Sequence, residues 1–256
     1  VSVRQILNDV PRIDYSDGGC PSLLLEVGKT NIATFSESTL NWGINNNTWG
    51  GTRTSNALTS PDGQKSADLI HVVQQSGVYI PHMNVTQGST YSSSVYAKHV
   101  SGTSILKFAL TSNFYGGTSL QERGIFVDLS DGSIISNTIG EFANVKVIDV
   151  GNGWYRLCIQ NHVARTTGTA AVTCYAQDTS FMEYSVWGGQ VEIGSSTLSY
   201  IPNLYNGITT RIGDAAKFAG NFEFNSSEGV LEARFKAFPI AELSSRITLA
   251  ADSSNR

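Results

Sequence analysis

The side chains that could take part in catalysis or metal binding are scattered along this chain. No G-x-S-x-G, phosphate-binding loop or H-E-x-x-H motif occurs in its 256 residues. The four histidines lack the short spacings of metal ligands: His71, His82, His99 and His162. Glycosidases use two carboxylates about 5–10 Å apart, and Asp128 with Glu192 is one candidate pair, but 21 acidic residues provide such pairs by chance. We therefore expect a protein that is not an enzyme.

Aromatic residues next to amides offer a different chemistry. Sugar-binding β-sandwiches cover the apolar faces of sugars with aromatic rings and bind the hydroxyls through Asn, Gln and Arg. Trp42 and Trp49 flank an asparagine-rich loop in "WGINNNTWGG", and Tyr115 precedes two glycines. Trp42 and Trp49 fit two roles, either as a sugar platform or as anchors of a first strand on the core.

The stretch "VGNGWYRL" contains two more candidates. Asn152 lies between two glycines, and an Asn-Gly pair tolerates the positive φ angles of a tight hairpin turn. The residues on both sides alternate between apolar and polar, which predicts a β-hairpin. If Leu157 faces the core, Tyr155 does too, and Trp154 and Arg156 face out of the sheet.

The same alternation in "VWGGQVEI" directs Trp187 and Val191 into the core and Gln190 outward. An outward face with an indole, a guanidinium and an amide suits a sugar. The sequence therefore predicts that a ligand site, if present, draws on six residues: Trp42, Trp49, Tyr115, Trp154, Arg156 and Gln190.

These candidates must be positioned by β-strands. Segments with a period of two recur between turn signals such as Asp131-Gly132, and no stretch has a helical stripe over three turns. About eight strands in roughly 170 residues are typical of a two-sheet antiparallel sandwich, either immunoglobulin-like or jelly-roll. The clearest strand candidates are 91–98, 105–111, 124–129, 145–150, 154–163, 169–175 and 184–193.

The strand pattern also divides the chain. Residues 1–30 precede the sandwich and are expected to form an N-terminal arm that packs against it, while 31–203 form the sandwich. In "SYIPNLYNGITTR" the pattern breaks, and it restarts in "FEFNSSEGVLEARF". Residues 204–256 are therefore expected to be a linker and the beginning of a second β-sandwich. The chain lacks an initiator Met and a signal-peptide pattern, which predicts a processed chain or part of a longer one.

Composition narrows the possible partners. The net charge of −4 provides no basic surface for nucleic acid, and no apolar run reaches the ~18 residues of a membrane-spanning helix. We expect neither nucleic-acid binding nor membrane insertion. Cys20, Cys158 and Cys174 do not form a disulfide framework, and the last two fit either a bridge between neighbouring strands or buried free thiols.

Five motifs in a fixed order resemble a module of tailed-bacteriophage tail fibre, tailspike and baseplate proteins. They are "VPRIDYSDGGCPSLLLEVGKTNIATFSE", "TSPDGQKSADLI", "YSSSVYAK", "DVGNGWYRL" and "VWGGQVEIGSSTLSYIPN". That module is similar to jelly-roll carbohydrate-binding modules. The end of the chain, "TTRIGDAAKF" with "FNSSEGVLEARF", resembles the start of a concanavalin-A/laminin-G-like sandwich.

The resemblance implies a virion component of the phage tail, assembled in the host cytoplasm. Its implied partners are a host surface polysaccharide or other glycan, other tail or baseplate proteins, and copies of itself, most often as a homotrimer. Related jelly rolls often hold a structural calcium ion, but no clear acidic cluster supports one here, so no cofactor is expected. Two alternatives remain open: a structural spacer without a ligand, and an accessory module of a secreted carbohydrate-active enzyme.

Overall fold

The computed structural model describes residues 12–14, 22–44, 51–73, 76–111, 114, 123–137, 144–176 and 181–214. The chain divides into two compact units, Val1–Ala216 and Lys217–Arg256. The second unit, where we expect the next sandwich to begin, lies wholly outside the described residues. The account below concerns the first unit.

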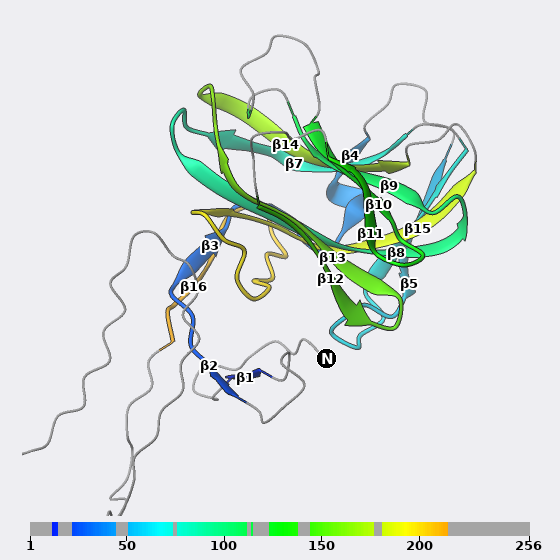
Figure 1. The fold of residues 1–256 in the computed structure, drawn as a ribbon, viewed down its shortest axis with the longest axis horizontal. Coiled ribbons are helices and arrows are strands. Elements are labelled where there is room, and N and C mark those ends of the chain that lie inside the picture. Colours follow the sequence, from blue (N-terminus) through cyan, green and yellow to red (C-terminus); the bar gives the residue numbers. More distant parts are fainter. Residues whose placement is uncertain are drawn as a thin grey trace, which may run out of the picture. The chain divides into compact units, whose positions relative to one another are not determined.

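Two antiparallel sheets face each other in this unit (Figure 1). The six-stranded sheet has the order β11 (Ser133–Asn137), β10 (Arg123–Asp128), β9 (Ile105–Leu110), β14 (Gly168–Ala176), β7 (Gly77–Val85) and β4 (Gly43–Ile44). The eight-stranded sheet has the order β12 (Asn144–Gly151), β13 (Trp154–Val163), β8 (Thr90–Gly102), β15 (Met182–Ile193), β3 (Lys29–Asn31) and β16 (Thr209–Arg211). Within it β6 (Ala67–Val72) pairs with β15 and with β5 (Thr52–Leu58).

Three short elements complete the described structure. A 3-10 helix, η1 (Thr39–Asn41), precedes β4, while β1 (Arg12–Asp14) and β2 (Ser22–Leu24) form a two-stranded sheet of their own. The predicted fold class is confirmed: the described residues form an antiparallel two-sheet sandwich with the character of a jelly roll.

The core lies between the two sheets and is built by alternate residues of each strand. Leu157 and Ile159 of β13 belong to it, as does Val191 of β15, and Tyr155 packs against it while half-buried. Leu106, Phe108 and Leu110 contribute from the facing sheet. Because side chains of a strand point alternately to its two faces, the neighbours of these residues point away from the core.

A β-bulge in β15 changes the direction of one predicted core residue. The register with β8 shifts between Trp187 and Gln190, where Gly188 has a φ of +65°. One extra residue moves the side chains before it to the opposite face. Trp187 is buried as expected, but it packs on the outer face of the eight-stranded sheet, so the prediction that it points inward with Val191 is wrong.

The predicted hairpin is confirmed, with its turn at the expected glycines. Gly151, Asn152 and Gly153 have φ values of +87°, +56° and +75°, the left-handed region that Gly and Asn tolerate best. Asp149 Oδ1 accepts a hydrogen bond from Gly151 N at 2.8 Å, which closes the turn. The turn therefore holds Trp154 at the first position of β13.

The eight-stranded sheet extends beyond both limits expected for the sandwich. β16 pairs with β3, with Thr209 opposite Asn31 and Arg211 opposite Lys29. Glu26 N donates to Asp214 Oδ2 at 2.7 Å, and Asp214 N donates to Glu26 O at 2.8 Å. Residues on both sides of 31–203 thus belong to the same sheet or extend its pairing.

Cys158 and Cys174 are free, buried thiols. Cys174 belongs to the core, whereas Cys158 occupies an outward position on β13. Burial raises the pKa of both thiols, which keeps them protonated and unreactive. Of the two alternatives left open for this pair, the structure shows the free thiols.

Candidate functional site

The structure describes four of the six predicted ligand-binding residues, and all four are buried. Trp49 and Tyr115 lie outside the described residues. The side chains that the structure does describe have low exposed fractions: Trp42 3%, Trp154 2%, Arg156 9% and Gln190 0%. The expected open face with an indole, a guanidinium and an amide is therefore not exposed.

Trp42 anchors the segment before β4 on the core. Its Nε1 donates to the carbonyl of Phe35 at 2.8 Å, and its ring approaches the backbone of Gly189 so closely that a methyl group there would lie 2.9 Å away. Of the two roles considered for Trp42, the structure supports the anchor.

Trp154 belongs to a second, smaller apolar cluster on the outer face of the eight-stranded sheet. It shares this cluster with Tyr96 and Trp187, and Tyr200 packs against it. The Trp187 and Tyr200 ring centroids are 4.5 Å apart. Trp187 Nε1 donates to Ser66 Oγ at 3.0 Å, which fastens the segment before β6 to this cluster. A buried aromatic with its polar atom satisfied is a packing residue.

Arg156 is enclosed by groups that stabilise its charge. Its Nε and Nη2 donate to Ser94 Oγ at 3.3 and 3.0 Å, and its guanidinium lies 5.4 Å from the centroid of the Tyr96 ring. Burial opposes the charge, but nearby acidic groups, including the carboxyl groups of Glu192 and Glu26, oppose this effect, and the pKa of Arg156 is raised. Arg156 is thus a buried cation that holds neighbouring strands together.

The segment after β15 hydrogen-bonds to the outer face of the eight-stranded sheet. Gln190 Oε1 accepts from Ile201 N at 2.6 Å, and Glu192 Oε2 accepts from Leu198 N at 3.1 Å. Gln160 Nε2 donates to Thr197 Oγ1 at 2.7 Å. These bonds make the predicted ligand face an internal polar layer.

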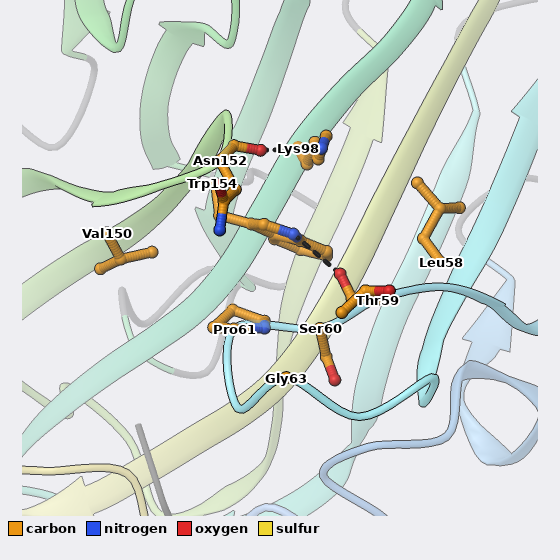
Figure 2. A pocket seen from close by; sticks show the side chains of 9 residues that line it. All are labelled: Leu58, Thr59, Ser60, Pro61, Gly63, Lys98, Val150, Asn152 and Trp154. Carbon is orange, nitrogen blue, oxygen red and sulfur yellow. Dashed lines mark hydrogen bonds between the residues drawn. The ribbon is translucent and has the colours of Figure 1, made fainter. Parts of the chain in front are cut away.

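A pocket of about 510 Å³ opens beside this layer. It lies between the loop that follows β5 and the β12–β13 turn, and Figure 2 shows the two segments facing each other. Its volume falls within the ~300–1,000 Å³ typical of small-ligand sites. The lining residues are Leu58, Thr59, Ser60, Pro61, Gly63, Lys98, Val150, Asn152 and Trp154.

Two hydrogen bonds hold the pocket together. Trp154 Nε1 donates to Thr59 O at 3.1 Å, and Lys98 Nζ donates to Asn152 O at 2.7 Å (Figure 2). Ser60 Oγ lies 2.5 Å from Asp62 Oδ1 and 2.7 Å from Ser66 Oγ, so it stabilises the loop from within. These bonds connect the loop after β5 and the strand β8 to the segment around the β12–β13 turn, and so fix the positions of the residues that line the pocket.

Of the four predicted residues that the structure describes, Trp154 alone lines the pocket. The two segments that form it are parts of "TSPDGQKSADLI" and "DVGNGWYRL", which are far apart in the sequence. Their turn residues could have drawn attention to both loops, but no local pattern indicates that they meet.

A second cationic group lies on the outer face of the six-stranded sheet. Lys107 of β9 is nearly buried, donates to the hydroxyl of Tyr175, and lies 4.9 Å from the Tyr175 ring centroid and 5.4 Å from that of Phe126. The amine is thus engaged within the sheet. Lys107 carries no signal in the sequence, because one lysine in an alternating strand is usually solvated.

Neither the candidate carboxylate pair nor a cluster of metal ligands is assembled among the described residues. Asp128 and Glu192 lie on different sheets. No cluster of three or more His, Cys, Asp or Glu in the described ranges could hold a metal ion, and no helix there is long and apolar enough to span a membrane. His162 is buried between aromatic rings, and burial lowers its pKa to about 3, so it is a neutral packing residue at pH 7.

No protein-family model matches the chain, and no curated protein matches it. Solved structures do. An endo-1,4-beta-D-xylanase of Clostridium thermocellum, solved with a family 22 carbohydrate-binding module and xylohexaose, matches at 14% identity and a TM-score of 0.40, over 69% of this chain and 30% of its own. A xylan-binding domain from Paenibacillus barcinonensis matches at 14% identity and a TM-score of 0.41, over 66% and 94%.

The enzymatically active domain of tailspike protein 4 from bacteriophage CBA120 also matches. Its identity is 13% and its TM-score 0.39, over 64% of this chain and 21% of the tailspike chain. The match thus spans less than a third of the xylanase and of the tailspike. Similarity at these low sequence identities and TM-scores says nothing about the ligand or the assembly of this chain.

Proposed function

We propose that this chain is a component of a bacteriophage tail fibre, tailspike or baseplate, and that its jelly roll binds a host surface glycan. The observation that carries the glycan-binding part is the pocket between the loop after β5 and the β12–β13 turn. Support for the viral part comes from the five ordered motifs that resemble a tail module, and three of those motifs contribute residues that line the pocket.

The chemistry of the pocket suits a sugar. Leu58, Pro61 and Val150 provide apolar walls for the C–H faces of a sugar ring. Thr59 and Asn152 add exposed neutral polar side chains for its hydroxyls. Trp154 is too deeply buried to stack on a ring, so its role is to hold Thr59 in place.

The proposal is tested by filling the pocket. Replacing Thr59 with Trp places a bulky side chain in the cavity, while Thr54→Trp places the same side chain on an exposed position of β5 that does not line it. On a glycan array that includes bacterial surface polysaccharides, we expect the wild type and Thr54→Trp to bind the same glycans. Thr59→Trp should lose at least about tenfold in affinity, or about 1.4 kcal/mol. Equal binding by Thr59→Trp would remove the pocket as the site.

A structural spacer is the second candidate, and a specific observation favours it. Trp42, Trp154, Arg156 and Gln190 all belong to the buried interior of the domain, Trp42 between the two sheets and the other three on the covered outer face of the eight-stranded sheet. A domain that only separates other parts of a tail needs such an interior and no ligand. If the wild-type chain binds nothing on the array while folded, the spacer is the better account.

An accessory module of a secreted enzyme would also bind glycans through this pocket, so it predicts the same loss of binding in Thr59→Trp. The two proposals differ in the particle or protein of which the chain is a part. We expect an antibody against the purified chain to label phage tails in electron micrographs, and labelling of a secreted enzyme instead would support the accessory module.

A further inference from the structure

We infer that the pocket selects glycans that carry a carboxylate, such as a hexuronate or a sialate. This inference rests on the proposed glycan-binding function and concerns the same site. The observation behind it is Lys98, the charged residue among those that line the pocket.

Lys98 is held in place without losing its capacity to bind. It lies on β8 opposite Trp154 of β13, and the end of its side chain lies over Gly153 of the β12–β13 turn, where a methyl group would be 3.6 Å from Lys98 Cε. Its Nζ donates to Asn152 O at 2.7 Å. An ammonium group has three N–H donors, so two remain for a ligand. A cation positioned by the backbone loses little entropy when it binds an anion.

No carboxylate lines the pocket to neutralise this ammonium group. Asp62 belongs to the same loop, but its Oδ1 is bonded to Ser60 Oγ and to Gln64 N at 3.0 Å. Asp149 precedes the facing turn and accepts from Gly151 N. Both carboxylates stabilise their own turns, so an anion in the pocket encounters Lys98 without a lining carboxylate to repel it.

The neutral groups of the pocket are suited to the rest of a sugar. Thr59 and Asn152 have exposed side chains with no hydrogen bond to a described residue. At Gly63 an added methyl group would touch nothing within 4 Å, so the rim is open there to a chain of linked sugars. A single ammonium group among apolar and neutral groups matches one negative charge on an otherwise neutral ring, whereas a phosphate dianion requires several charged donors.

The full 1–256 chain tests this inference on an array that pairs hexuronate- and sialate-bearing glycans with neutral glycans of the same backbone. We expect binding to the acidic members, at least about tenfold weaker affinity for their neutral counterparts, and weakening at high salt. Lys98→Gln retains a donor for Asn152 O and should lose this preference. Lys98→Arg should keep it.

Lys146→Gln is the matched control, because it removes the same charge from an exposed position of β12 that does not line the pocket. If the chain binds neutral and acidic glycans equally, or Lys98→Gln binds like the wild type, the carboxylate inference is wrong while glycan binding stands. If the folded chain binds no glycan of either kind, the proposed function fails and the inference fails with it.

Discussion

The indole Nε1 of Trp154 donates a hydrogen bond to the carbonyl oxygen of Thr59, 3.1 Å away. This bond joins the first residue of β13 to the loop after β5, two segments separated by 95 positions in the chain. It sets the distance between the two walls of the pocket. Trp154 therefore acts on a ligand indirectly, by positioning the loop that contains Thr59.

Removing this bond should increase the mobility of the loop after β5, while lowering the stability of the fold only slightly. Trp154→Phe keeps most of the ring but leaves Thr59 O without its donor, which costs about 1 kcal/mol of unfolding free energy. Trp154→Ala also removes buried aromatic surface and should cost about 3–5 kcal/mol. Hydrogen exchange of residues 58–63 should accelerate in Trp154→Phe, with exchange in β9 unchanged as the internal control. Unchanged exchange of the loop would show that the bond does not position it.

The core assignment of β13 is tested by Leu157→Asp. An unpaired carboxylate between the sheets costs several kcal/mol, so we expect an unfolded domain by circular dichroism. Val163→Asp places the same charge on an exposed position of the same strand and should fold normally. A soluble, folded Leu157→Asp protein would contradict the strand assignment.

The layer formed by the segment after β15 depends on Gln190. In Gln190→Glu, the new carboxylate would be buried near Glu192, a carboxyl group whose pKa burial already raises. Urea denaturation should show a loss of about 1–3 kcal/mol at pH 7. Gln64→Glu makes the same change at an exposed position and should have little effect. If both variants were equally stable, the segment after β15 would not be anchored through Gln190.

His162 should make stability depend on pH. Burial lowers its pKa to about 3, whereas an unfolded histidine has a pKa of about 6.5. Between about pH 3 and pH 6.5, His162 therefore binds a proton in the unfolded state and remains neutral in the folded state. The stabilising contribution is therefore complete above about pH 6.5 and falls toward pH 3 by up to about 1.4 kcal/mol per pH unit.

The measurement is urea denaturation between pH 7 and pH 4 of the wild type and of His162→Phe. The phenyl ring can pack against Tyr91 and Phe114 as the imidazole does. The variant should show a shallower loss of stability on acidification. An identical slope for His162→Phe would show that His162 does not titrate on unfolding.

Assembly is predicted from the sequence of the C-terminal part. Residues 214–256 are rich in phenylalanine. We expect these apolar residues to be covered by other copies of the chain, most simply in a trimer. Light scattering of the 1–256 chain tests this. A monodisperse monomer with a folded C-terminal segment would contradict it.

Local sequence patterns were sufficient for seven of the strands, β8, β9, β10, β12, β13, β14 and β15, and for the principal turn. The alternation in β13 correctly directed Leu157 inward and Arg156 outward, because neighbouring side chains of a strand must point to opposite faces. The Gly151–Gly153 turn was equally predictable, since its positive φ angles depend on those three residues alone. In β15 the same reasoning failed for Trp187, because the bulge at Gly188 inserts one residue into the count.

What lies over a sheet was not predictable in this way. Alternation shows that Gln190 leaves the core, but the hydrogen bond from Ile201 N that buries it forms only when the chain folds back over β15. The pocket likewise requires Thr59 and Trp154 to meet. The sequence alone determined the main strand segments and the β12–β13 turn, and with them the fold class, because alternation and turn chemistry are local patterns. Only the tertiary structure decided which outward side chains are buried and where a pocket is open, because both depend on contacts between segments far apart in the chain.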